Sequence, residues 1–228
     1  MPNLSDSVLD IRGFQLFRND FISVRPKHGV CIYVKSHLKV GKITKPIPNV
    51  LAIHLTDYDL YVLTVYRPPS NSPDENTRLA EFLENFVTGK EVIILGDFNL
   101  PTIKWGDNSP DSQACRADKL FFESFSTLGL NQFVNEPTFI PSGNILDLAL
   151  STELDRIVDV RTFPPFPNCG HVVVCVDYLF QGHHHSGPGT NAKNTLRNWS
   201  KGKYSELTAS LKLIDWNLEF VSGCKFSI

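Results

Sequence analysis

The apolar run at residues 92–95 is the strongest constraint on the fold of this chain. Four consecutive apolar side chains, Val-Ile-Ile-Leu, are typical of a strand that is buried on both faces of a sheet. Gly96 ends the run, and Asp97 and Asn99 follow at alternate positions. Alternation predicts that these two polar side chains point the same way from the end of a core strand. A buried carboxylate is costly without partners, so this strand end is a candidate site, with an ordinary Gly-Asp-Asn turn as the alternative.

The segment before this strand predicts a helix with a clear beginning and end. Ser72 is a favourable N-cap, Pro73 suits the first helical position, and Glu75 completes a capping box. Gly89 follows the last apolar residue of the pattern, as is typical of a helix C-terminus. The buried face of the helix is predicted from apolar residues at helical spacing, which are Leu79, Phe82, Leu83 and Phe86.

Strands rich in β-branched residues are predicted on both sides of this helix. Residues 50–55 and 60–66 flank a short polar turn and predict a β-hairpin. A second helix is predicted at 112–128, and further strands at 13–17, 29–34, 145–150, 157–160 and 171–176. The alternation of strands and helices predicts an α/β fold in which helices pack on a sheet.

The composition excludes several classes of protein. The net charge of −2 gives no general reason to expect nucleic-acid binding, so such a function must rest on local features. The apolar runs are too short to span a bilayer, so we predict no membrane association. The five cysteines are scattered, form no C-x-x-C pair, and indicate neither a disulfide framework nor a zinc site. They fit a reducing intracellular compartment, nuclear or cytoplasmic.

The composition changes after residue 180 and predicts a division of the chain into three parts. Residues 1–180 carry the strand and helix patterns of one domain. Residues 181–195 are rich in Gly, His and Ser, which is typical of a linker. Residues 196–228 contain an amphipathic segment, which predicts a connector helix with one apolar face made by Tyr204, Leu207, Leu211 and Ile214.

Polar residues suited to catalysis recur where predicted core strands begin or end. They are Tyr66, the pair Asp97 and Asn99, Asp147 and His171. In α/β proteins such strand ends commonly meet at one edge of a sheet and build a site there. Each residue alone also has a structural interpretation, because an acid within a strand can be a satisfied core acid and a single histidine is commonly structural. Their joint occurrence in this order favours a site.

Five short motifs give the chain a specific resemblance. They are Val-Tyr-Arg-Pro-Pro at 65–69, Gly-Asp-Phe-Asn-Leu-Pro at 96–101, Glu-Pro-Thr at 136–138, Ile-Leu-Asp-Leu at 145–148 and Cys-Gly-His at 169–171. In this order they resemble the endonuclease/exonuclease/phosphatase superfamily, and more narrowly the apurinic-type endonuclease domain of LINE-type (non-LTR) retrotransposon polyproteins of the jockey and CR1 kind. Residues 197–216 also resemble the connector between that domain and a reverse transcriptase, which implies such a module as a partner in a full-length protein.

The resemblance implies a four-layer α/β sandwich, DNase I-like, with a divalent-metal site at one edge. Such enzymes cleave phosphodiesters by in-line attack of water, with Mg²⁺ or Mn²⁺ stabilising the charge on the phosphate. The implied substrate is DNA, with Arg67 and Thr138 at the DNA-facing surface. The implied metal ligand among the matched residues is Asp97, a weak one because the main ligand of the family is absent here.

The resemblance also implies a role for each polar residue at the strand ends. Asp97 would orient or deprotonate the attacking water, and Asn99 would hold a phosphate oxygen. Tyr66 would donate a hydrogen bond to the phosphate. Asp147 would bond one nitrogen of His171, so that the other nitrogen faces the scissile phosphate.

Departures from the family pattern predict impaired activity. Residues 1–7 align with the loop after the metal-binding Glu of the family, so the first two strands, with that Glu and an Asn, are expected to be missing. The closing Ser-Asp-His of the family reads Cys169, Gly170 and His171 here, which removes a second acid. Carboxylates supply most of the affinity for a hard cation, so both losses weaken metal binding.

Two alternatives to a DNA endonuclease stay open on the sequence. One is a non-catalytic remnant of the domain, which binds nucleic acid weakly or not at all. The other is a different phosphoesterase of the superfamily, such as a phosphoinositide phosphatase or a deadenylase. The retrotransposon-like segment at 197–216 argues against the second alternative.

Overall fold

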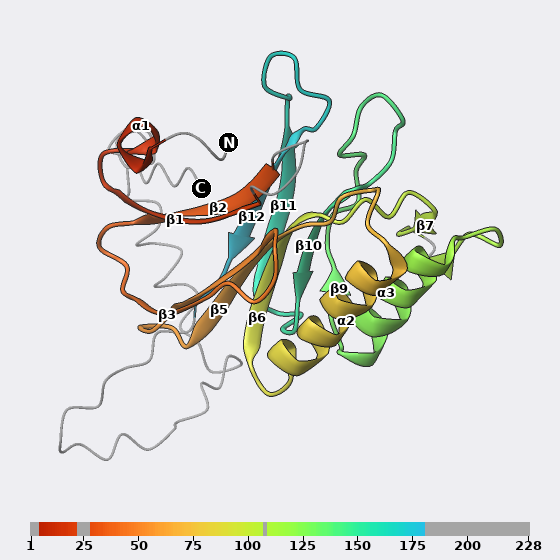
Figure 1. The fold of residues 1–228 in the computed structure, drawn as a ribbon, viewed down its shortest axis with the longest axis horizontal. Helices are drawn as coiled ribbons and strands as arrows, with labels where there is room; N and C mark the ends of the chain where they lie inside the picture. The colour runs from red at the N-terminus through yellow and green to blue at the C-terminus, as the bar shows by residue number, and fades with distance from the viewer. Residues whose placement is uncertain (1–4, 22–27, 107–108, 181–228) are drawn as a thin grey trace, which may run out of the picture. The chain divides into compact units, whose positions relative to one another are not determined.

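A six-stranded sheet forms the centre of the fold (Figure 1). The computed structural model describes residues 5–21, 28–106 and 109–180, and the predicted linker at 181–195 and connector at 196–228 lie outside the described residues. Only β5 and β6 run parallel, and their neighbours pair antiparallel. In spatial order the strands are β3 (Val40–Thr44), β4 (Val50–Leu55), β5 (Leu60–Tyr66), β6 (Glu91–Asp97), β10 (Asp147–Ser151) and β9 (Asn131–Gln132). The predicted hairpin and core strand are confirmed as β4, β5 and β6.

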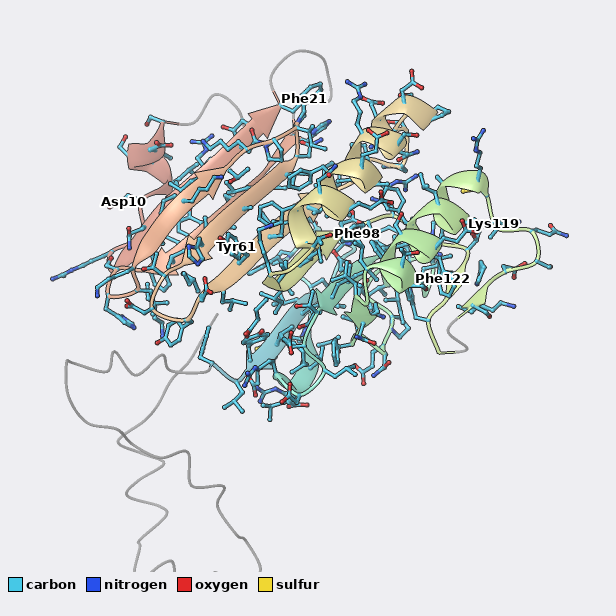
Figure 2. The ribbon with its side chains drawn as sticks, turned by 90° about the horizontal axis from the view of Figure 1, so that it is seen from below. Asp10, Phe21, Tyr61, Phe98, Lys119 and Phe122 are labelled. Atoms are coloured by element: carbon cyan, nitrogen blue, oxygen red, sulfur yellow. The ribbon has the colours of Figure 1, made fainter. Side chains whose placement is uncertain are left out.

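Two helices, α2 (Pro73–Val87) and α3 (Arg116–Thr127), lie side by side and cover one face of this sheet (Figure 1). The predicted capping box of α2 is confirmed, because the Ser72 hydroxyl accepts a hydrogen bond from the Glu75 N–H while the Glu75 carboxylate accepts one from the Ser72 N–H. Phe98, labelled in Figure 2, packs edge to face on Phe121 and Phe125 of α3. The core of the fold therefore lies directly behind the end of β6.

Two separate strand pairs cover the opposite face of the sheet. They are β1 (Phe14–Phe21) with β2 (His28–Lys35), and β11 (Ile157–Phe163) with β12 (Val173–Tyr178). A second apolar cluster, which includes Val34, Ile93 and Val176, fills the space between them and the sheet. Val62 and Leu95, on this face, are only partly buried, whereas Leu63 and Ile94 on the helix-covered face are completely buried. The α/β class is confirmed, and the described residues form helix, sheet and strand-pair layers.

The remaining described elements are short. α1 (Asp6–Leu9) is a single turn, and β7 (Ile103–Lys104) pairs with β8 (Ser109–Pro110) in a small ribbon that the sequence did not predict. α3 begins later than predicted because the Asp111 carboxylate accepts a hydrogen bond from the Gln113 N–H and forms a turn there. Within the described residues, no helix is long and apolar enough to cross a membrane.

Candidate active site

Four polar residues meet at one edge of the central sheet, where β5, β6 and β10 lie side by side (Figure 1). β5 and β6 are parallel and end together, so that Tyr66 is paired with Asp97. β10 runs the other way and begins at this edge, with Asp147 paired to Asp97. His171 reaches the same edge from a bridge to Phe139, just before β12. The prediction that these strand ends meet is confirmed.

Gly96 is required by the close approach of β5 to β6 just before Asp97. A Cβ atom on Gly96 would lie 1.9 Å from the carbonyl oxygen of Val65, and the φ angle of Gly96 is +152°. No other residue could adopt this backbone without displacing β5. The glycine that precedes Asp97 therefore fixes the place of the carboxylate at the sheet edge.

Asn99 holds the Asp97 carboxylate through two hydrogen bonds. The Asn99 N–H donates to Asp97 Oδ1 at 3.0 Å, and Asn99 Nδ2 donates to Asp97 Oδ2 at 2.8 Å. The two side chains meet because the chain turns after β6, with Asn99 at a φ angle of +48°, and not through alternation along a strand as the sequence suggested. Asn99 Nδ2 also donates to the carbonyl oxygen of Arg67 at 3.0 Å. Asn99 thus positions Asp97 within the chain, and its expected contact with a phosphate oxygen stays a prediction.

Asp147 and His171 form the pair that the resemblance implied. The distance between His171 Nδ1 and Asp147 Oδ2 is 2.7 Å. The ring of Phe139 lies against the imidazole of His171, with 4.7 Å between ring centroids. A carboxylate on Nδ1 fixes the orientation of the ring, which leaves Nε2 as the nitrogen available to a substrate.

The pKa of Asp97 is raised from its ordinary value of 3.8 to about 6. Burial of the carboxyl group is the main cause, and the neighbouring charge of Asp147 adds to it. The Asn99 hydrogen bonds and the nearby His171 oppose the rise. Burial, together with the charge of Asp97, also raises the pKa of Tyr66, so the phenol keeps its proton and stays a hydrogen-bond donor.

Arg67 does not reach the surface where DNA contact was predicted. Its side chain is only 4% exposed. The guanidinium donates to Asn76 Oδ1 on α2 at 2.8 Å and to the carbonyl oxygens of Phe98 and Asn99 at 3.0 and 2.8 Å. These bonds tie the turn after β6 to the helix. The structure therefore corrects the role of Arg67 from DNA contact to support of the Asp97 turn.

Thr138 is likewise part of the scaffold and not of the surface. Its side chain is 0% exposed, and its hydroxyl oxygen accepts hydrogen bonds from the N–H groups of Leu146 and Asp147, each at 2.9 Å. These N–H groups precede and begin β10, which explains why the strand starts two residues later than predicted. The expected DNA contact is corrected, because a buried hydroxyl that satisfies two backbone donors cannot also face a ligand.

Phe139 and Gly170 contribute to the site in a way that sequence reasoning missed. A Cβ atom on Gly170 would lie 2.6 Å from Cε2 of Phe139. The Phe139 ring thus fills the space in which a side chain at 170 would begin, next to His171. No spacing or motif singled out Phe139, because a single aromatic residue after a Glu-Pro-Thr turn carries no periodic signal.

The residues at this edge fit a divalent cation. One ligand atom each from Asp97, Asp147 and His171 lie within 4.8 Å of one another, and the described part of the chain holds no other such group of three. Two carboxylates at this separation repel each other, which is consistent with the raised pKa of Asp97. A cation would relieve that repulsion, and carboxylate oxygens are the donors that Mg²⁺ and Mn²⁺ prefer.

Comparison with known proteins agrees with this arrangement. Residues 60–177 match the family described as endonuclease-reverse transcriptase. The endonuclease domain of TRAS1, a telomere-specific non-LTR retrotransposon, superposes with a TM-score of 0.61 at 19% sequence identity, over 75% of this chain and 81% of that domain. A 3′ phosphatase from Neisseria, bound to a product DNA hairpin, gives a TM-score of 0.60 at 16% identity, over 78% and 84% of the two chains.

A protein of the endonuclease/exonuclease/phosphatase family from Leptotrichia buccalis gives a TM-score of 0.51 at 12% identity, over 73% of this chain and 72% of that chain. No curated protein sequence matches the chain. At these identities the solved structures show the shared fold, while the family match covers more than half of the sequence. The chain belongs to the endonuclease-reverse transcriptase family, within the endonuclease/exonuclease/phosphatase superfamily.

Proposed function

We propose that this domain binds DNA and hydrolyses its phosphodiester bonds at the sheet edge where Asp97, Asp147 and His171 meet. The observation that carries the proposal is the close grouping of these three side chains, with the pKa of Asp97 raised to about 6. Perturbed carboxyl groups that cluster with a histidine are typical of catalytic sites. The 3′ phosphatase of similar fold that is bound to a product DNA hairpin supports DNA as the substrate.

Asp97 is suited to act on the attacking water. A carboxyl group with a pKa of about 6 is mostly ionised near neutral pH, yet is a stronger base than an ordinary aspartate. The two hydrogen bonds from Asn99 hold the carboxylate in one orientation. A base held in this way takes a proton from water at a defined position, which is the requirement for in-line attack on phosphorus.

His171 and Tyr66 are suited to stabilise the phosphate. Asp147 holds Nδ1 of His171 and so directs Nε2 toward the position of a phosphate oxygen. The phenol of Tyr66, whose pKa is raised, stays protonated and supplies a second donor beside Asp97. Donors fixed in place before the reaction stabilise the charge that develops on the phosphoryl oxygens. If Asp97 and Asp147 held a divalent cation, the pKa of Asp97 would fall and its carboxylate would orient the water instead of taking its proton. The cation would supply positive charge at the same phosphate oxygens.

A second candidate function is DNA binding without cleavage. The residue before His171 is Gly170, and the described cluster offers two carboxylates only. Because affinity for a hard cation depends on the number of charged oxygen ligands, this set binds Mg²⁺ weakly. If the domain binds DNA without cleaving it, its role is to hold DNA for another module. The family description supports a reverse transcriptase as that module in a longer protein.

The test is the nicking of supercoiled plasmid by the 228-residue chain with Mg²⁺, with Mn²⁺ and with EDTA. His171→Ala and Asp147→Asn are the site variants. His54→Ala is the matched control, because His54 also pairs with an aspartate, Asp59, at 2.8 Å, but on the β4–β5 hairpin.

Metal-dependent nicking that both site variants abolish, and that His54→Ala retains, would support hydrolysis. Binding of the plasmid without nicking in either metal would support the second candidate. Turnover of a small phosphoester with no nicking of DNA would contradict both and favour a different phosphoesterase of the superfamily.

A further inference from the structure

A cavity of about 380 Å³ lies beside Tyr66 and shares that residue with the candidate active site. Its walls come from the end of β1, the start of β2, the β4–β5 edge and the first turns of α2. Asp97, Asp147 and His171 do not line it. Ligand pockets are commonly about 300–1,000 Å³, so this cavity suits a group of the size of one nucleoside.

One wall of the cavity is aromatic. The rings of Phe21 and His28 are stacked, with 5.0 Å between their centroids and an interplanar angle of 14°. The His28 ring meets Tyr66 edge to face, with a centroid distance of 5.4 Å. Aromatic surfaces of this kind stack with nucleobases without strong dependence on sequence.

The aromatic wall is held in place by two asparagines. Asn49 has a φ angle of +62°, is only 6% exposed, and lies 2.7 Å from His28 Nδ1 through its side-chain oxygen. Its backbone carbonyl accepts a hydrogen bond from the Tyr66 N–H at 2.9 Å. Asn19 on β1 donates two hydrogen bonds of 2.8 Å to the carbonyl oxygens of Ile47 and Val50, on either side of Asn49. The wall is therefore formed before any ligand binds, which lowers the entropy cost of binding.

A cation also lines the cavity. Arg78 on α2 is exposed, and its Nε donates a long hydrogen bond of 3.3 Å to the carbonyl oxygen of Asp74. Glu75, the acid that lines the cavity, already accepts hydrogen bonds from the N–H and hydroxyl of Ser72, which lower its pKa. The carboxylate is thus engaged at the N-terminus of α2, while the guanidinium of Arg78 can contact a phosphate.

We infer that this cavity binds the nucleoside next to the scissile phosphate of the DNA strand, with its base against the Phe21–His28 wall and its distal phosphate at Arg78. The inference rests on the proposed function, because Tyr66 places the cavity one strand away from Asp97. A base enters a side pocket only when it leaves the stack, and this costs least in single-stranded or distorted DNA. The cavity therefore selects DNA that is unpaired beside the cleavage point.

The test measures binding and cleavage separately. The full chain is titrated in EDTA against a short fluorescent single-stranded oligonucleotide and a series in which each nucleoside in turn is made abasic. Ser70→Trp fills the cavity from an exposed turn, and Arg78→Ala removes the cation. Arg116→Ala, an exposed arginine on α3 that does not line the cavity, is the matched control. Cleavage of the same oligonucleotides is then measured with Mn²⁺.

We expect base removal at one position to weaken binding by the wild-type chain about tenfold, and to have no further effect in Ser70→Trp. Arg78→Ala should weaken binding at all sequences and lower the slope of affinity against salt by about one, while Arg116→Ala should not. An equal response to base removal at every position, the same response in Ser70→Trp, or no binding at all would overturn the inference. If cleavage occurs but is unaffected by base removal, the inference about the cavity is wrong and the proposed hydrolysis stands. If binding depends on the base but no cleavage occurs, the inference stands and the proposed hydrolysis is wrong.

Discussion

Replacement of Asp97 by asparagine should raise the stability of the chain relative to the wild type as the pH increases from acid to above neutral. The pKa of Asp97 is about 6 in the folded chain and near 3.8 when exposed in the unfolded chain. Between these values the folded chain holds a proton that the unfolded chain has released. The free energy of unfolding of the wild-type chain therefore falls as the pH rises through this window.

The size of the effect follows from the same two values. At ~1.36 kcal/mol for each pH unit, a rise from 3.8 to about 6 corresponds to ~3 kcal/mol. The Asp97 side chain is partly exposed, so we expect about 2–3 kcal/mol after allowance for screening by solvent. The substituted asparagine side chain has the shape of the protonated acid but no charge to bury. Because the amide NH2 cannot accept a hydrogen bond, the variant loses one of the two bonds from Asn99 at every pH. The stability of the variant relative to the wild type should therefore rise by the full amount between pH 3.8 and about pH 7, from a constant starting offset.

Urea unfolding in EDTA, followed across this pH range, measures the difference for the pair of proteins. Asp111→Asn is the control, because hydrogen bonds to Gln113 and Lys104 lower the pKa of that exposed carboxyl group. The ionised Asp111 carboxylate stabilises the folded chain at high pH, and this stabilisation is lost as the pH falls. The difference in free energy of unfolding between Asp111→Asn and the wild type should therefore change with pH in the opposite direction.

A difference between Asp97→Asn and wild type that stays flat with pH would refute the reasoning. It would mean that folding does not raise the pKa of Asp97. The argument that charge repulsion in the cluster favours a cation would then fail. Addition of Mn²⁺ gives a second check, since a cation at ten times its dissociation constant stabilises the folded state by about 1.4 kcal/mol. That gain should be seen in the wild type and be reduced in Asp97→Asn.

Three further substitutions test how the site is supported. Gly96→Ala should cost at least about 2 kcal/mol, since its Cβ would strike a backbone carbonyl of β5, while Gly106→Ala, with open space around it, should stay within about 0.5 kcal/mol in urea unfolding. Thr138→Val should cost ~1–3 kcal/mol for each backbone N–H left unpaired, and Thr138→Ser should restore stability with an unchanged urea slope. The single variant Gly170→Asp should have a lower melting temperature than the wild type. Tighter Mn²⁺ binding, measured by calorimetry, is expected only for the double variant that also carries Phe139→Leu.

Local patterns in the sequence were sufficient for the elements that bring the site together. The apolar run at 92–95 and Gly96 identified β6 and its end, because burial on both faces and close backbone approach leave direct marks on residue type. The capping box at Ser72 identified the start of α2 for the same reason. The proximity of Tyr66 and Asp97 could be predicted because each residue ends one of two neighbouring strands, which are parallel. Each of these inferences depends on residues that are near one another in the chain.

The roles of individual side chains were not predictable in the same way. Arg67 was expected at the DNA surface, yet its partners are Asn76 and the carbonyl oxygens of Phe98 and Asn99, the last two more than thirty positions away. Thr138 was expected there as well, and its hydroxyl instead satisfies two backbone donors that begin β10. Tertiary contacts decide which polar atoms form hydrogen bonds with each other. A sequence motif identifies the residue but not its partner.

Gly170 illustrates the same limit at the point that matters most for activity. On the sequence, glycine in this place means one lost acid and a weaker metal site. In the structure, the space in which its side chain would begin is filled by Phe139, whose ring lies against His171. The ring therefore helps to hold the imidazole that Asp147 orients, and the two positions are coupled. An acid at 170 would have to displace the ring, so a carboxylate at this position and the present packing of the histidine exclude each other.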